Sequence, residues 1–488
     1  MRILIADDKV AGSRALRPFF RTGARSTRVR KLRGTRAGKA TMGELIVSCP
    51  PRKAIKGPED CSCAGIDLGD QPEQAASVFD ALGLALLNRG CLKEGAALVQ
   101  RALEIRLKFF GPDHPLTALS RNSTARAQRE LGELDSAFAA VSDAIRINTK
   151  AYGPHSLAIA INLVELGICQ LQQGSFGAAL QSARNGLCIL TTLGLYDTDP
   201  NTTRLLDIRG RAELNLDQVQ EAAATYKELL PLDLRQLGTR NHPKYATHLA
   251  NEAGVKEALR KIAAAEQGYR TAIDLYEKSL DRPCHPNLID ACSALGSLLR
   301  IRNGSGDLAE AGELFDRALR LDVQIRGPGH YFTGNDHADL GRYYYDSDQR
   351  SSALSEFQQA LDIYDKNVQT GALPANHIFI AESQTWKGRI LIESGEADAG
   401  SAESILENAV QIWPTQLGPD TVGGAIAKAC LGRSLFLQHK SLPRARQLLL
   451  EAYPIVLRAL GVNHAFTQQV LQWLAELGIN PAKKRAMA

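Results

Sequence analysis

One short loop recurs nine times along this chain of 488 residues, at a spacing of 41 to 47 residues. Its first copy reads GPDHP, and later copies keep a histidine, aspartate or threonine close to a glycine or proline. The loop position is occupied by His114, His155, Asp199, His242, His285, His330, His377, Thr421 and His464. A period near 43 residues indicates an array of small structural units, each packed against the next.

The residues between successive loops form two apolar-periodic segments joined by a short break. In residues 97–110, ALVQRALEIRLKFF, apolar positions recur at intervals of three and four, which is the period of an amphipathic helix. The breaks contain turn-forming residues, as in LGELD and NGSGD. Each repeat is therefore predicted to be a helix hairpin, and the fold class is predicted to be all-α.

Small residues recur at matched positions in the two predicted helices of each repeat. In one repeat the second helix carries Ala353, Phe357 and Ala360, and the first helix carries Gly341. Small side chains let two helix backbones approach closely, while the large one fills the space between turns. The hairpins are therefore predicted to be tightly packed.

The period, the small residues and the loop together resemble tetratricopeptide repeats, of the long kind found in kinesin light chains. The resemblance implies a right-handed superhelical α-solenoid of about nine helix hairpins at residues 73–463, with a capping helix and basic tail at 464–488. A motor function is not implied, because no heptad-repeat segment precedes the array. HEAT and armadillo arrays share the period but do not explain the recurring His-Pro loop.

The basic charge of the protein is concentrated at its N-terminus. Residues 1–60 carry 15 Lys/Arg and 5 Asp/Glu, whereas the remaining residues carry 43 and 48. We expect residues 1–72 to be a basic, largely disordered arm. Two alternatives stay open: an organelle transit peptide, or a true start at Met42. Nucleic-acid binding is not expected; only residues 1–60 are basic enough for it, and they have no aromatic residue within the basic run after Phe20.

Cysteine usage and hydropathy bear on the compartment. The nine cysteines are odd in number and include no C-x-x-C pair, which favours a reducing compartment. The sequence contains no apolar run of about 18 residues that would span a bilayer. We therefore predict a cytoplasmic protein that does not act in a membrane.

The loop histidines are the first candidates for chemistry, because seven of the ten histidines occupy that position. Equivalent positions in stacked repeats lie along one edge and do not converge, whereas a metal site needs three or four ligands around one point. We expect the histidines to terminate and start helices. The sequence has no nucleophile motif and no phosphate-binding glycine loop, so no enzyme activity, metal or cofactor is predicted.

Arginines offer the other candidate site. The resemblance implies that the residue after the small position of each first helix points into the concave face. Five of the nine such residues are arginines: Arg126, Arg211, Arg342, Arg389 and Arg433. A row of guanidinium groups would bind the carboxylates of an acidic peptide or of a protein's C-terminus. The alternative is that each arginine pairs with an acid of a neighbouring repeat, such as Glu393 or Asp346.

The predicted function is a non-catalytic protein-protein interaction scaffold that binds a peptide or a partner helix in its concave groove. The alternative is a regulatory or sensor module whose enzymatic or DNA-binding part lies on a separate polypeptide. Both functions need a protein partner, and neither needs a cofactor.

Overall fold

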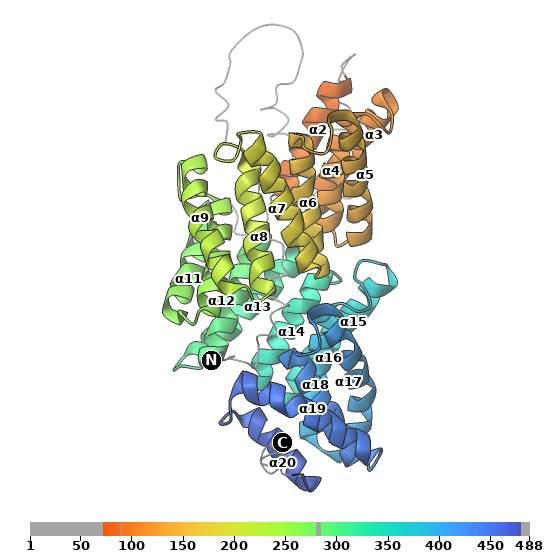
Figure 1. Ribbon diagram of the computed structural model, residues 1–488, viewed down its shortest axis with the longest axis vertical. Coiled ribbons are helices and arrows are strands. Elements are labelled where there is room, and N and C mark those ends of the chain that lie inside the picture. The colour runs from red at the N-terminus through yellow and green to blue at the C-terminus, as the bar shows by residue number, and fades with distance from the viewer. Residues whose placement is uncertain (1–71, 89, 280–284, 480–488) are drawn as a thin grey trace.

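The computed structural model describes residues 72–88, 90–279 and 285–479 (Figure 1). Every regular element in this part of the protein is an α-helix, which confirms the predicted fold class. The predictions for the basic arm and for the tail beyond residue 479 lie outside the described residues. None of the described helices is both long and apolar enough to cross a membrane.

Nineteen helices occupy the described residues and pack as nine consecutive hairpins followed by one last helix, which confirms the predicted number of hairpins. They are α2 (Pro72–Leu87), α3 (Leu92–Phe110), α4 (Pro115–Glu130), α5 (Leu134–Tyr152), α6 (Leu157–Gln173), α7 (Phe176–Thr192), α8 (Pro200–Asn215), α9 (Val219–Leu237), α10 (Pro243–Ala258), α11 (Ile262–Ser279), α12 (Pro286–Arg302), α13 (Asp307–Ile325), α14 (Tyr331–Asp346), α15 (Arg350–Gln369), α16 (Ile378–Ser394), α17 (Glu396–Leu417), α18 (Val422–Leu437), α19 (Leu442–Leu460) and α20 (Ala465–Glu476). Even numbers from α2 to α18 mark the first helix of each hairpin and odd numbers mark the second.

The recurring loop starts each new hairpin. The imidazole Nδ1 of His114 accepts a hydrogen bond from the Leu116 amide at 3.2 Å and so caps α4. Five further loop histidines cap the following helix in the same way: His242, His285, His330, His377 and His464. Asp199 and Thr421 do so with their oxygens. His155 departs from the pattern, because Ser156 takes the cap position of α6. These side chains satisfy backbone amides that a helix start would otherwise leave unpaired.

The small residues give the close approach that was predicted. A Cβ atom at Gly341 would lie 2.9 Å from the ring of Phe357, and one at Gly388 would lie 2.5 Å from Cγ of Leu406. Phe357 and Leu406 are fully buried. A side chain at either glycine would force the two helices of its hairpin apart.

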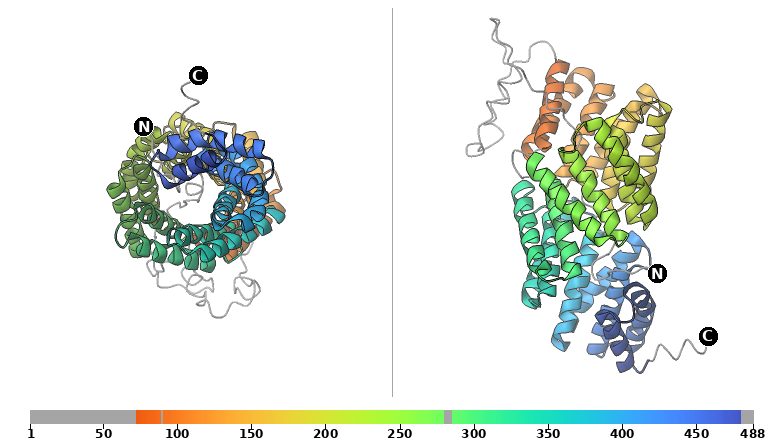
Figure 2. Two further views of the ribbon diagram at one scale, coloured as in Figure 1. Left: turned by 90° about the horizontal axis from the view of Figure 1, so that it is seen from below. Right: turned by 90° about the vertical axis from the view of Figure 1, so that its left-hand side faces the viewer.

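The hairpins are arranged as a coil, which appears as a closed ring along its long axis (Figure 2). Thirteen of the sixteen residues of α8 are buried, compared with six of the nineteen in its hairpin partner α9. The first helices therefore line the inside of the coil and the second helices cover its outside. We call the inward side of the first helices the inner face.

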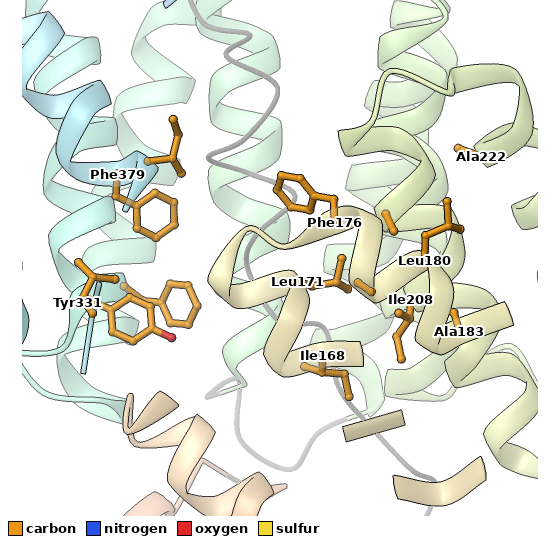
Figure 3. Close-up of a cluster of buried hydrophobic side chains, with 14 of the residues drawn as sticks. Ile168, Leu171, Phe176, Leu180, Ala183, Ile208, Ala222, Tyr331 and Phe379 are labelled. Carbon is orange, nitrogen blue, oxygen red and sulfur yellow. The ribbon is translucent and has the colours of Figure 1, made fainter. Parts of the chain in front are cut away.

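The coil is short enough in pitch for its second turn to touch its first turn. Nε2 of His377, before α16, lies 3.2 Å from the carbonyl oxygen of Gln172 at the end of α6, 205 residues earlier. A Cβ atom at Gly132 would lie 3.0 Å from Nε2 of His330. Tyr331 and Phe379 face the region of Phe176 across this contact (Figure 3). We call this contact between the turns the seam; no pattern in the sequence predicted it.

The last helix, α20, closes the end of the array by covering α19. Its residues Phe466, Val470, Trp473 and Leu474 are buried in one apolar cluster with α18 and α19. A helix that covers the exposed edge of the final repeat is what a solenoid needs at its end. α20 lies within residues 464–488, and the division of the chain into repeats and a capping segment stays a prediction.

Candidate functional site

The five predicted arginines all lie on inner helices, but they do not form a row of unoccupied guanidinium groups. Nε of Arg389 donates to Oε1 of Glu393 at 3.0 Å, and Arg433 pairs with Glu476 of α20. Nη1 of Arg211 lies 3.8 Å from Oδ2 of Asp207. The pairing of arginines with acids of the array is therefore the arrangement that the structure contains, and binding of a peptide to them stays a prediction.

Arg342 is buried and pairs with two carboxylates. Its guanidinium group is 2% exposed and contacts Asp339 of its own helix and Glu382 of the next inner helix, the latter at 2.6 Å. Burial by itself would lower the pKa of Arg342, but the two carboxylates outweigh burial and raise the pKa above its usual range. Asp346, considered as a partner from the sequence, pairs with Arg300 instead.

Arg126 has a different environment. Its Nη2 donates to the side-chain oxygen of Asn88, and burial lowers the pKa of Arg126 to about 10, helped by the positive charges of Arg204 and Arg129. Arg126 therefore remains charged at neutral pH. Around it, Nη2 of Arg204 bonds to Oε1 of Glu165 at 2.5 Å, and Nη2 of Arg129 lies 3.7 Å from the other oxygen of Glu165.

Sequence reasoning missed this cluster because it considered only one position per helix. Arg204 lies seven residues before Arg211 and Glu165 lies three residues before Ile168, so each faces the same side of its helix as the position that was considered. Reading the whole inward stripe of each first helix, instead of one residue, would have found the paired charges.

Aromatic rings surround the two arginines nearest the C-terminal end. The guanidinium carbon of Arg389 lies 4.7 Å from the ring centre of Phe466 and 5.0 Å from that of Tyr345. That of Arg433 lies 5.8 Å from the ring centre of Trp473. Cation-π contacts of this kind hold the arginine side chains in place in addition to their ion pairs.

A cavity of about 470 Å³ lies at the seam. It is lined by Gln173, Gly174, Ser175, Phe176, Gly177, Ala178, Leu216, Pro374, Asn376, His377 and Thr415. Burial lowers the pKa of His377 to about 4, so the imidazole is neutral at physiological pH and accepts its capping hydrogen bond. Among the described residues that line this cavity, none carries a carboxylate or ammonium group.

The described residues offer little for metal or thiol chemistry. No group of three or more His, Cys, Asp or Glu side chains within them could hold a metal ion. Burial raises the pKa of Cys169, Cys292 and Cys430 to about 12, which keeps these thiols protonated and poorly nucleophilic. The polar groups of the inner face are used instead to pair one repeat with the next.

Parts of this chain are similar to known proteins. The clustered mitochondria protein homolog of Homo sapiens is 29% identical over 125 residues, which are 26% of this chain and 10% of that protein. The chain thus matches about a tenth of the length of this relative. The quorum sensor NprR from B. thuringiensis has a similar structure, with 11% identity, a TM-score of 0.48, and coverage of 83% of this chain and 99% of that one.

Two further solved structures are similar. A kinesin-light-chain-type protein of Podosopora anserina with nearly identical TPR-like repeats is 18% identical, with a TM-score of 0.34 and coverage of 44% of this chain and 100% of that one. A tetratricopeptide repeat protein from Parabacteroides merdae is also 18% identical, with a TM-score of 0.37 and coverage of 65% and 98%. A tetratricopeptide repeat family model matches residues 74–150 and 290–366. These matched residues, set among nine helix hairpins, identify a tetratricopeptide repeat protein.

Proposed function

We propose that this protein is a non-catalytic scaffold whose inner face holds an extended peptide or a helix of a partner protein. The observation that supports the proposal best is the inner face itself, on which side chains of the same helix position follow one another from repeat to repeat. Tetratricopeptide repeats generally mediate protein-protein interactions. A cytoplasmic location is part of the same proposal.

We further propose an acidic partner, and two of the five arginines are the best candidates to contact it. The side chain of Arg433 is 17% exposed, and its partner Glu476 is 33% exposed, so this pair can exchange partners at low cost. Arg126 lies among three guanidinium groups that share Glu165 and Glu130. Arg342 is 2% exposed and joins two repeats through its ion pair with Glu382, whereas Arg389 is paired with Glu393 of its own helix.

The test uses a fluorescent ten-residue peptide rich in glutamate and follows its anisotropy with the full-length protein. We expect the variant Arg126→Gln, Arg433→Gln to weaken binding at least about tenfold, because a hydrogen bond to a charged group contributes about 1.5–3 kcal/mol. The variant Arg101→Gln removes an exposed arginine of the outer helix α3 and should bind as the wild type does. Equal binding by both variants would contradict the role of the arginines.

The scaffold function has a separate test, because it does not require an acidic partner. With the full-length protein as bait, captured proteins should be lost in the inner-face variant Leu119→Arg and retained in Arg101→Gln. Leu119 lies on α4 and is 48% exposed, so the substitution alters the surface without disturbing the packing. Identification of the captured protein would also decide whether the scaffold regulates an enzyme or DNA-binding protein on a separate polypeptide. Capture that Leu119→Arg does not change would contradict the scaffold function.

A further inference from the structure

The coil has two different edges, and these edges contact each other at the seam. We call the loops between hairpins the loop rim and the turns within hairpins the turn rim. At the seam, loop-rim residues His330 and His377 of the second turn contact turn-rim residues near Gly132 and Gln172 of the first turn. Within one molecule, a stretch of loop rim therefore packs on a stretch of turn rim.

Within the described residues, the loop rim of the first turn is not covered by another turn, and it exposes large apolar side chains. Phe109, Tyr152 and Leu193 are 56%, 58% and 43% exposed, and each lies at the end of an outer helix, one repeat from the next. Where the loop rim is covered by the seam, apolar residues are buried: Ile325, at the position equivalent to Phe109, is 8% exposed and Leu373 is 1% exposed. A row of solvent-exposed apolar side chains along one edge indicates a contact surface.

In the second turn of the coil, the turn rim also exposes a large apolar side chain. Leu442 is the first residue of α19 and is 46% exposed. The equivalent first residue of α7, Phe176, lines the seam cavity and is 4% exposed. Phe176, Ile325 and Leu373 are thus buried at the seam, and their counterparts at the ends of the coil are exposed, although Leu216 at the seam cavity and Val462 on a second-turn loop stay 38% and 53% exposed.

We propose that a second copy of this protein docks at these ends, so that the first-turn loop rim of one molecule packs on the second-turn turn rim of the next. A second copy is favoured because the contact would continue the seam that already joins the two turns within one molecule. The two surfaces differ, so the contact is head-to-tail and can repeat to form a growing stack. This inference does not depend on peptide binding at the inner face.

Sedimentation velocity of the full-length protein tests the proposal. Oligomers should grow with concentration up to about 100 µM, the range in which weak contacts are populated. The loop-rim variant Phe109→Asp, Tyr152→Asp and the turn-rim variant Leu442→Asp should each weaken association at least about tenfold, which is about 1.4 kcal/mol. Mixed in equal amounts, they should form a dimer that does not grow, because one intact loop rim then meets one intact turn rim. The control Arg101→Asp replaces an exposed arginine midway along α3, away from both rims, and should associate like the wild type.

Other outcomes would overturn the proposal. If the wild-type protein is a monomer at every concentration up to about 100 µM, the proposed contact does not exist. If one variant is monomeric and the other still dimerises by itself, the contact joins two identical surfaces and is not head-to-tail. Circular dichroism of each variant separates loss of association from loss of folding, and all substituted side chains are at least 43% exposed in the single molecule.

Discussion

Replacing Arg342 with alanine is expected to lower the free energy of unfolding by about 3–5 kcal/mol, because the substitution leaves two buried carboxylates without their guanidinium group. Asp339 and Glu382 are 1% and 3% exposed and lie in adjacent repeats. Their negative charges would then repel each other where water cannot screen them. Urea denaturation followed by circular dichroism measures the loss.

Two matched variants make the result specific to this ion pair. Arg433→Ala removes an arginine at the same helix position whose ion pair is partly exposed, and it should cost about 1 kcal/mol or less. Adding Glu382→Gln to Arg342→Ala removes one of the two repelling charges and should recover part of the lost stability. A loss below about 1 kcal/mol for Arg342→Ala would show that the pair does not hold repeats seven and eight together.

Stability is expected to fall steeply as the pH is lowered from about 6.5 to about 5. Burial, followed by the positive charge of Arg326, lowers the pKa of His330 to about 3, and burial lowers that of His377 to about 4. An unfolded histidine titrates near pH 6.5, so between this pH and the folded pKa the unfolded state binds more protons than the folded state. Stability is therefore complete above about pH 6.5 and is lost on acidification, at about 1.4 kcal/mol per pH unit for each histidine.

The two histidines together should cost about 4 kcal/mol between about pH 6.5 and about pH 5, a range in which most carboxylates remain ionised. Protonation would also destroy the capping bond at Nδ1 and place a charge in the seam. Urea denaturation at several pH values measures the slope. The variant His330→Asn, His377→Asn keeps a capping side chain but does not titrate, so its stability should change little over this range. A wild type that is equally stable at both pH values would contradict the burial of these neutral histidines.

Local features of this fold could be predicted from the sequence because they are set within one repeat. The GPDH-type loop gave both the hairpin boundaries and the capping role of its histidines, as His114 shows. Gly341 and Phe357 contact each other across a single hairpin, so their spacing alone predicted the close approach. These contacts join residues fewer than 20 positions apart in the sequence.

The seam could not be predicted in this way. Whether Gln172 meets His377 depends on the sum of the small rotations between five successive hairpins, and no residue pattern in one repeat records that sum. The sequence predicted that the arginines could pair with acidic residues, but it did not predict which acidic residue each arginine contacts. Arg389 does pair with Glu393, but Asp346 pairs with Arg300, because that choice depends on how adjacent repeats are offset.

The most direct measurement is disulfide formation between Asp135→Cys and Gly371→Cys. A Cβ atom at Gly371 would lie 3.7 Å from Oδ2 of Asp135, on the other side of the seam. Because Oδ2 lies two bonds beyond its own Cβ, the two Cβ atoms can be up to about 6 Å apart, and a local shift of these exposed residues brings them to the separation of about 3.5–4.5 Å that a disulfide requires. A coil closed by the seam predicts an intramolecular disulfide that forms readily in the doubly substituted protein under mild oxidation and in neither single variant. Absence of that bond in the folded monomer would contradict a coil whose two turns touch.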